Sequence, residues 1–247
     1  GSLPAWLTFD AANRKFTGTP AAGDVGAPSI HVTATDNHGG SVSDDFILTV
    51  STSELPFNET FEGPVPAGQI APDVRIHDKS VTPSFATTTT TPLNGSASLQ
   101  ATRPTVGSRP IATVDFNDPA TPSNITNVSV NVSTGGGNGT TLWNNAVITF
   151  DYQSPNNYKF AGVFQIIHRL IIGKVVNGKV TYLAQKSFNA SANTLIPLQL
   201  AINHTSDLVT LSSGAASVSH TFSSIGAGTV GVGTINANAE FDNLAIS

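Results

Sequence analysis

The chain has 247 residues, of which 39% are hydrophobic and 11% charged, and its formal net charge at pH 7 is −5. Because it contains no cysteine, disulfides, thiol catalysis and zinc sites with Cys ligands are excluded. The weak acidic balance excludes a basic surface for nucleic acid or anionic lipid. The most apolar stretch, residues 161–173, is interrupted by polar side chains and is too short to cross a bilayer, so we expect no membrane insertion.

The predicted elements are strands throughout. Apolar and polar residues alternate in short runs between turn-forming residues, and no window sustains a helical spacing of apolar residues. The Asn177-Gly178 pair, between two alternating runs, predicts a tight hairpin turn. In chain order, the predicted strands span residues 29–34, 43–50, 127–132, 146–152, 178–183, 207–211, 217–222, 229–233 and 240–246. Residues 97–101 and 111–116 also alternate. Many short strands without helices between them predict an antiparallel all-β sandwich or barrel.

The chain is predicted to contain two domains. A polar stretch at residues 51–56 separates the strand-like run 46–50 from a new start at Phe57, so we expect an incomplete domain at 1–50, a linker at 51–56 and a second domain at 57–247. Gly1-Ser2, without Met, resembles a cloning scar on an excised fragment. Residues 71–123 are rich in Thr, Pro, Ser and Asn, and two interpretations stay open there: long loops that decorate a sandwich, or a disordered stretch.

The first segment carries a recognisable set of motifs. They are Leu3-Pro4-Ala5-Trp6-Leu7-Thr8-Phe9-Asp10, Phe16-Thr17-Gly18-Thr19-Pro20, Ile30-His31-Val32-Thr33-Ala34-Thr35-Asp36 and Phe46-Ile47-Leu48-Thr49-Val50. Together they resemble the second half of a dystroglycan-type cadherin-like, or immunoglobulin-like, domain of the kind repeated in large bacterial surface proteins. Such a sandwich needs about 100 residues, so half of it is missing here. Either a longer domain was cut, or the half-domain packs against the second segment, or another chain supplies the strands.

The second segment is similar to concanavalin-like, or laminin-G-like, jelly-roll modules. The motifs that carry the resemblance are Asn58-Glu59-Thr60-Phe61-Glu62-Gly63, the run 147–162 and Phe241-Asp242-Asn243-Leu244-Ala245-Ile246. The resemblance implies that a strand near the start of this segment lies beside the last strand. The expected fold class is therefore all-β, a partial immunoglobulin- or cadherin-like sandwich followed by a concanavalin-like antiparallel β-sandwich.

Catalytic motifs are sparse. Some enzymes with the concanavalin-like fold cut glycans with carboxylates spaced Glu-x-Asp-x-x-Glu or Glu-x-Asp-x-Glu on one strand. Glu240-Phe241-Asp242 begins this pattern, but Leu244 and Ala245 stand where the second Glu should be. No Gly-x-Ser-x-Gly or His-Glu-x-x-His motif occurs, and the six His are scattered. We therefore expect that the protein is not an enzyme.

Calcium is the expected cofactor, because Ca²⁺ takes several oxygen ligands and the loop ends are rich in them. In a regularly alternating last strand, Asp242 shares a face with Leu244 and Ile246, and Glu59 lies on the inward face of the opening strand in the same way. Carboxylates in such positions need a partner or a metal. Together with Glu62 they predict a rim site that joins the first and last strands. The alternative is that these carboxylates lie at open strand ends in water.

A second calcium ligand is expected in the first segment. Asp36 begins a loop where the cadherin-like resemblance places interdomain calcium. His38 stands where the cadherin Asp-x-Asp motif has its second Asp, which weakens this expectation.

Sugar binding would need exposed aromatic faces beside polar hydrogen-bonding groups. Trp143 and Tyr158, each next to a pair of asparagines, fit this description and are the predicted ligand-binding residues. The alternative for both is packing in the core.

The sequence favours a non-catalytic adhesion or spacer module of a large secreted or cell-surface protein, stabilised by calcium. A carbohydrate-binding module is the alternative, and a polysaccharide-cleaving enzyme is the third interpretation. The expected partners are an extracellular glycan or neighbouring domains of the same chain. Eight Asn-x-Ser/Thr sites fit a secreted glycoprotein.

Overall fold

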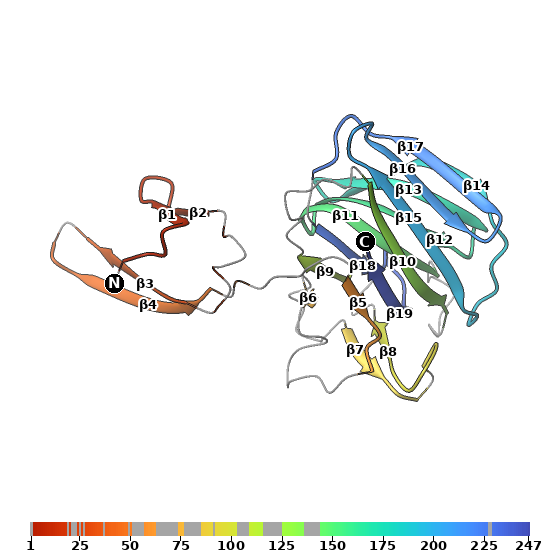
Figure 1. Ribbon diagram of the computed structural model, residues 1–247, viewed down its shortest axis with the longest axis horizontal. Coiled ribbons are helices and arrows are strands. Elements are labelled where there is room, and N and C mark those ends of the chain that lie inside the picture. The colour runs from red at the N-terminus through yellow and green to blue at the C-terminus, as the bar shows by residue number, and fades with distance from the viewer. Residues whose placement is uncertain are drawn as a thin grey trace. The chain divides into compact units, whose positions relative to one another are not determined.

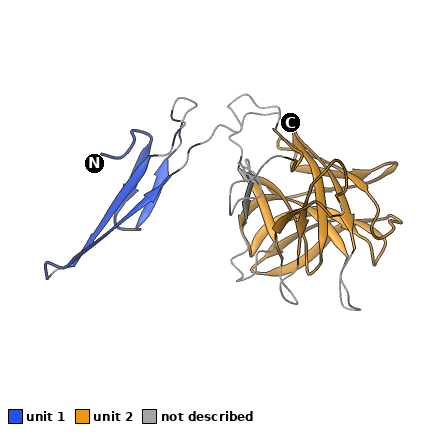
Figure 2. Ribbon diagram, turned by 90° about the horizontal axis from the view of Figure 1, so that it is seen from below, with its two compact units in different colours: residues 1–52 blue, residues 53–247 orange. Residues whose placement is uncertain are grey.

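The structure is a computed structural model in which the chain divides into two compact units, Gly1–Thr52 and Ser53–Ser247 (Figure 2). It describes residues 2–18, 20, 24, 26, 28–36, 38–48, 50, 57–62, 74–76, 85–90, 92–102, 109–115, 125–135, 144–226 and 229–247, without the side chains of 74–76, 114, 115 and 229. The predicted linker at 51–56 and Trp143 lie outside these residues. No helix that could cross a membrane is found in the described residues.

The first unit consists of two hairpins. Strands β1 (Leu7–Asp10) and β2 (Lys15–Gly18) form one, and β3 (Ser29–Thr35) and β4 (Ser41–Ile47) form the other. Leu7, Ile30 and Val50 are buried, whereas every residue of β4 is exposed. This unit therefore has little core of its own among its described residues. Two-stranded sheets of this kind are marginally stable alone.

The second unit is built from two antiparallel sheets (Figure 1). The eight-stranded sheet has the order β17 (Ala216–Thr221), β16 (Leu208–Ser213), β15 (Ile196–Asn203), β10 (Ile125–Thr134), β19 (Ala239–Ile246), β8 (Ser98–Ala101) and β7 (Phe85–Thr88), with β5 (Phe57–Glu59) also paired to β19. The seven-stranded sheet has the order β14 (Lys179–Ser187), β13 (Arg169–Val176), β12 (Asn157–Phe164), β11 (Asn145–Ser154), β18 (Thr229–Gly233), β9 (Ile111–Asp115) and β6 (Val74–Ile76). The predicted all-β fold class is confirmed.

The main core lies between the two sheets. Phe150, Leu170, Leu198 and Phe241 are among its fully buried side chains. Strands of the eight-stranded sheet alternate regularly between this core and a polar outer face, as the burial of β15 shows residue by residue. In most of these strands the sequence alternates between apolar and polar residues, as expected for a strand with one buried face.

A second apolar cluster, the outer aromatic cluster, covers the other face of the seven-stranded sheet. It consists of Ile111, Val147, Tyr158, Phe160, Phe164, Ile171, Val175 and Ile235. Both faces of β12 and β13 are therefore buried, and strands buried on both faces read as continuous apolar runs. This explains why residues 161–173 are the most apolar stretch of the chain although they form two strands and a turn.

Two specific expectations are met by strand pairing. β5 pairs antiparallel with β19, so the first and last strands of the second unit lie side by side. Asn177 and Gly178, with φ of 50° and 77°, form the turn between β13 and β14, in which Val176 pairs with Lys179. Positive φ at both central residues is what a tight hairpin of this kind requires.

Candidate functional site

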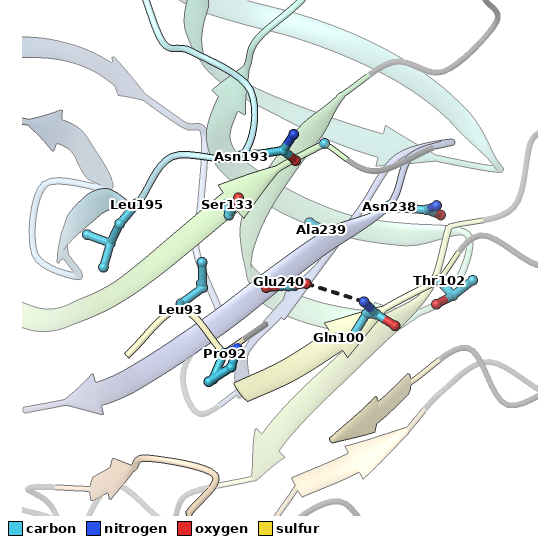
Figure 3. A pocket seen from close by; sticks show the side chains of 11 residues that line it. Pro92, Leu93, Gln100, Thr102, Ser133, Asn193, Leu195, Asn238, Ala239 and Glu240 are labelled. Carbon is cyan, nitrogen blue, oxygen red and sulfur yellow. Dashed lines mark hydrogen bonds between the residues drawn. The ribbon is translucent and has the colours of Figure 1, made fainter. Parts of the chain in front are cut away.

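A polar cavity lies on the outer face of the eight-stranded sheet, over β8, β19 and β10 (Figure 3). Its volume is about 650 Å³. Its floor is a cross-strand row, because Glu240 pairs with Ser133 on one side and with Gln100 on the other. Cross-strand partners share a face of the sheet, so the three side chains line one surface. The lining residues are Pro92, Leu93, Gln100, Thr102, Ser133, Gly135, Asn193, Leu195, Asn238, Ala239 and Glu240.

Glu240 is the one acid among the lining residues. Partial burial raises the pKa of its carboxyl, and the hydrogen bond donated by Gln100 Nε2 to Oε1, at 3.3 Å, lowers it. Figure 3 shows this pair at the centre of the floor. The carboxylate of Glu240 is thus held by a neutral amide, which leaves it free to accept further hydrogen bonds from a ligand.

The rim of the cavity combines amides with small apolar surfaces. The Asn193 backbone N–H donates to Thr134 O at 3.0 Å, which fixes this loop residue beside the end of β10. Gly135 has φ of +146°, and a Cβ there would lie 2.3 Å from Asn193 Oδ1, so glycine permits the close approach of this amide. Leu195 is 46% exposed and adds an apolar edge. Uncharged amides beside apolar patches can hydrogen-bond and pack against a polyhydroxylated ligand.

The predicted calcium ligands occupy a different place from the one expected, because β19 contains a β-bulge. Asp242 pairs with Asn131 and Ala245 with Ser129, so Asn243 and Leu244 together lie opposite Val130. The bulge reverses the alternation between Asp242 and Leu244. Asp242 therefore lies on the outer face with Asn131, not on the inward face with Leu244 and Ile246 as predicted. It is nevertheless only 1% exposed.

Glu62 lies close to Asp242 and is held by a loop. Its carboxylate accepts hydrogen bonds from the backbone N–H groups of Ser96 and Ala97 and from the Ser96 hydroxyl. These hydrogen bonds lower the pKa of Glu62, and the bond from the Ser96 hydroxyl has the largest effect. Gly95, with φ of +65°, is needed here, because a Cβ would lie 2.0 Å from Glu62 Oε1.

Glu59 does not join the other two carboxylates, which corrects the expected grouping. By register it pairs with Leu244, and its Oε1 accepts a hydrogen bond from the Phe61 N–H at 2.6 Å. Within the described part of the chain, no three His, Cys, Asp or Glu side chains form a group that could hold a metal ion. The structure thus brings Glu62 near enough for its charge to raise the pKa of Asp242, and it leaves Glu59 on the opposite face of the sheet.

Asp242 is the one charged residue that the described part of the chain buries. Burial raises the pKa of its carboxyl, the backbone N–H groups of Asn243 and Asn94 lower it, and the charge of Glu62 raises it. Oδ1 accepts from Asn243 N at 2.7 Å, whereas Oδ2 is buried without a hydrogen-bond partner. A buried carboxylate oxygen without a partner is energetically costly unless a proton or a cation neutralises it.

The other predicted site residues have separate roles. Asp36 closes the turn between β3 and β4, since its Oδ1 accepts from the backbone N–H groups of His38 and Gly40, each at 2.8 Å. Tyr158 is 3% exposed and belongs to the outer aromatic cluster, so the prediction that its ring offers an open face for a sugar is wrong. β12 directs it into that cluster together with Phe160. Trp143 lies outside the described residues.

Sequence reasoning missed most of the cavity. Gln100, Asn193 and Asn238 stand in no motif, and Glu240 is recognisable only as part of an incomplete catalytic pattern. The available signal was alternation: Gln100, Ser133 and Glu240 are polar residues that alternate with the buried Leu99, Val132 and Phe241.

Comparisons with known proteins agree with these two architectures. A family model described as "Putative Ig domain" matches residues 1–51. No curated protein matches the chain by sequence. The structure is similar to a protein of unknown function with a galectin-like fold from Bacillus subtilis (9% identity, 77% of this chain, 94% of that chain, TM-score 0.50).

Two further solved structures are similar to this one. One is the GH43 protein BlXynB from Bacillus licheniformis (12% identity, 87% of this chain, 45% of that chain, TM-score 0.51). The other is a carbohydrate-binding module, CBM66, from Bacillus subtilis (16% identity, 66% of this chain, 95% of that chain, TM-score 0.49). At such identities the likeness concerns the fold, which is of the jelly-roll or galectin-like kind.

Proposed function

We propose that the second unit binds carbohydrate without cleaving it, and that the polar cavity over β8, β19 and β10 is the binding site. The observation that carries this proposal is the lining of the cavity. Amide, hydroxyl and carboxylate groups from three adjacent strands and three connecting segments converge on a hollow of about 650 Å³, beside the half-exposed Leu93 and the exposed Leu195. Sites of this size with a few placed polar groups are typical for small polar ligands.

The fold supports carbohydrate binding better than the adhesion or spacer role. Similar structures include a protein of unknown function with a galectin-like fold and a GH43 protein. The lone acid of the cavity favours binding over hydrolysis, since paired carboxylates are the usual means of cleaving a glycosidic bond. We place the protein outside the cell, at the surface or secreted, where an adhesive role would be carried out through glycan binding.

Affinity electrophoresis in gels that contain soluble polysaccharides tests the proposal. Wild-type protein should be retarded by at least one of laminarin, xylan, galactomannan and amylose. Gln100→Ala and Asn193→Ala should each weaken binding about five- to tenfold, the loss expected for one or two hydrogen bonds. Gln185→Ala is the matched control, because Gln185 is an exposed amide on β14 of the other sheet.

If neither cavity variant changes the retardation, the binding site lies elsewhere on the protein. Complete absence of retardation, with the wild-type fold intact by circular dichroism, would refute carbohydrate binding by these polymers. Release of reducing ends from any of the four would refute the non-catalytic part of the proposal.

We also propose that Ca²⁺ binds between Glu62 and Asp242. The unpartnered buried Oδ2 of Asp242 and the nearby charge of Glu62 fit a hard cation, which takes carboxylate oxygens as ligands. The ion would neutralise two acids that otherwise repel each other. It would also join β19 to the loop that Glu62 holds through Ser96 and Ala97.

Thermal unfolding with calcium and with a chelator tests the ion. Calcium at a hundredfold excess over its Kd should stabilise the second unit by about 2.7 kcal/mol, and chelator should remove this gain. Asp242→Asn should abolish the response to chelator, whereas Glu59→Gln, which changes an acid on the opposite face, should keep it. An equal melting temperature in calcium and in chelator would eliminate this site.

A further inference from the structure

We infer that the carbohydrate ligand is an extended neutral polysaccharide, which continues from the polar cavity across the outer face of the eight-stranded sheet toward β17. The inference rests on the proposed function and names the class of its ligand. The surface in question is the hydroxyl–amide track, which consists of Asn127, Ser129, Gln199, Thr210, Ser212, Ser217 and Ser219.

The track is organised as two parallel rows by strand register. In one row Ser129 of β10 pairs with Gln199 of β15, which pairs with Ser212 of β16, which pairs with Ser217 of β17. All four side chains lie on the outer face, because the residues between them along each strand belong to the main core. A continuous line of hydroxyl and amide groups thus crosses four strands.

The second row runs beside the first. Asn127 pairs with Ala201, Ala201 with Thr210, and Thr210 with Ser219. The Thr210 and Ser219 hydroxyls lie 2.9 Å apart and hydrogen-bond to each other. The small Ala201 leaves a hollow in the second row between Asn127 and Thr210, and a shallow pocket of about 330 Å³ lies there, lined by residues of both rows. The rows therefore form a groove with polar sides.

The track is continuous with the cavity along β10. Asn127, Ser129, Asn131 and Ser133 are successive outward residues of this strand, and Ser133 lines the cavity. Residues two apart in a strand are about 6.8 Å apart, so Ser129 and Ser133 are separated by about 14 Å. Four strands side by side add about 14 Å across the sheet. A ligand that follows both directions must be a chain of several sugar rings.

The charges of the sheet select a neutral chain. None of its eight strands contains Lys or Arg, whereas the strands of the other sheet contain Arg75, Lys159, Arg169, Lys174, Lys179 and Lys186. The neighbouring strand β19 carries the acids Asp242 and Glu240 on its outer face, and the net charge of the chain is −5. An acidic polysaccharide would find no Lys or Arg side chain on these strands, and Glu240 would repel it. Hydroxyls and amides without charge match the hydroxyl groups of a neutral polymer.

Isothermal titration with an oligosaccharide series of the polymer that binds best in electrophoresis tests the inference. Wild-type affinity should rise with chain length from the disaccharide to the octasaccharide. The double variant Gln199→Ala/Asn127→Ala should lower affinity for the octasaccharide about tenfold and leave the disaccharide unchanged, since about two hydrogen bonds are lost outside the cavity. Gln185→Ala again serves as the control on the other sheet.

The outcomes separate this inference from the proposed function. If wild-type affinity does not depend on length, or if the double variant binds the octasaccharide normally, the track does not bind the chain, although the cavity still does. If alginate or polygalacturonate binds as tightly as the neutral polymers, the neutral class is wrong. If the double variant changes the mass of the protein in light scattering without changing octasaccharide binding, the track is a self-association surface, which overturns the inference.

Discussion

The two sheets of the second unit differ in how many of their faces are buried. At β11, β12 and β13 the seven-stranded sheet is covered on both faces, by the main core on one side and by the outer aromatic cluster on the other. The eight-stranded sheet buries one face and exposes hydroxyls and amides on the other. The first arrangement stabilises the sandwich, and the second leaves a surface available for a ligand.

This difference separates the packed surfaces that stabilise the sandwich from the surface that we propose for ligand binding. Outer-face substitutions in β11, β12 and β13 remove packed apolar contacts, whereas equivalent substitutions in β15 and β16 remove contacts with water. The comparison can therefore be tested by pairs of equivalent substitutions, one in each sheet.

The largest effect is expected for Ile171→Ala, on the outer face of β13. Ile171 is fully buried in the outer aromatic cluster, so truncation should lower the free energy of unfolding by about 2–5 kcal/mol. Gln199→Ala on the outer face of β15 should change it by less than about 0.5 kcal/mol. Urea unfolding followed by far-UV circular dichroism measures both, and equal losses would contradict the comparison.

A smaller effect is expected for the asparagine pair Asn145→Ala and Asn131→Ala. Asn145 is fully buried, and its amide donates to Ile235 O at 2.7 Å and accepts from Ile235 N at 2.8 Å. Its loss leaves two buried backbone groups unpaired and should lower the free energy of unfolding by about 2–3 kcal/mol. Asn131, half-exposed on the other sheet, should lose well under 1 kcal/mol. The same urea titration measures both variants. A larger loss of unfolding free energy for Asn131→Ala than for Asn145→Ala would overturn the assignment of faces.

The smallest effect is a pH dependence at Asp242, measured in chelator. Burial raises the pKa of Asp242 above its usual 3.8, so the folded state binds more protons than the unfolded state above that pH. The free energy of unfolding attributable to Asp242 should therefore fall as pH rises from about 3.8 through the raised pKa. The stability of Asp242→Asn relative to wild type should increase over the same range.

Glu62 acts in the opposite direction and supplies the control. Its pKa is lowered from 4.5 by the Ser96 hydroxyl and the loop N–H groups, so its contribution to stability is lost as pH falls below that value. Glu62→Gln should flatten this loss and keep most of the Asp242 dependence, because burial raises the pKa of Asp242 more than the charge of Glu62 does. A constant difference between wild type and Asp242→Asn across the range would show that Asp242 has an ordinary pKa.

The fold class could be predicted from sequence because most strands have one buried face, and alternation records that face directly. β12 and β13 were not predicted, because burial on both faces removes the alternation and leaves one continuous apolar run. β15 was missed although Ile196, Leu198, Leu200 and Ile202 alternate. Pro197 argues against a central strand, but here it lies on the outer face near the strand end, opposite Asn131.

The candidate site was less predictable than the fold. The bulge at Asn243–Leu244 depends on how β19 pairs with β10, and no local pattern in the sequence reveals it. It moved Asp242 to the other face and separated it from Glu59. The cavity joins Gln100 to Glu240 across 140 positions, and such a juxtaposition follows from strand order, which alternation does not contain.

The second unit can complete its folding only after β19 has been synthesised. This strand pairs with β10, β8 and β5, contributes Phe241 to the core and carries both Glu240 and Asp242. During synthesis the preceding strands are made first and must wait with unpaired edges until residues 239–246 emerge. Pairing across such separations is slow. A ribosome-bound chain that stops before β19 should therefore lack both the closed sandwich and the proposed ligand site, so that any binding activity would report a completely folded unit.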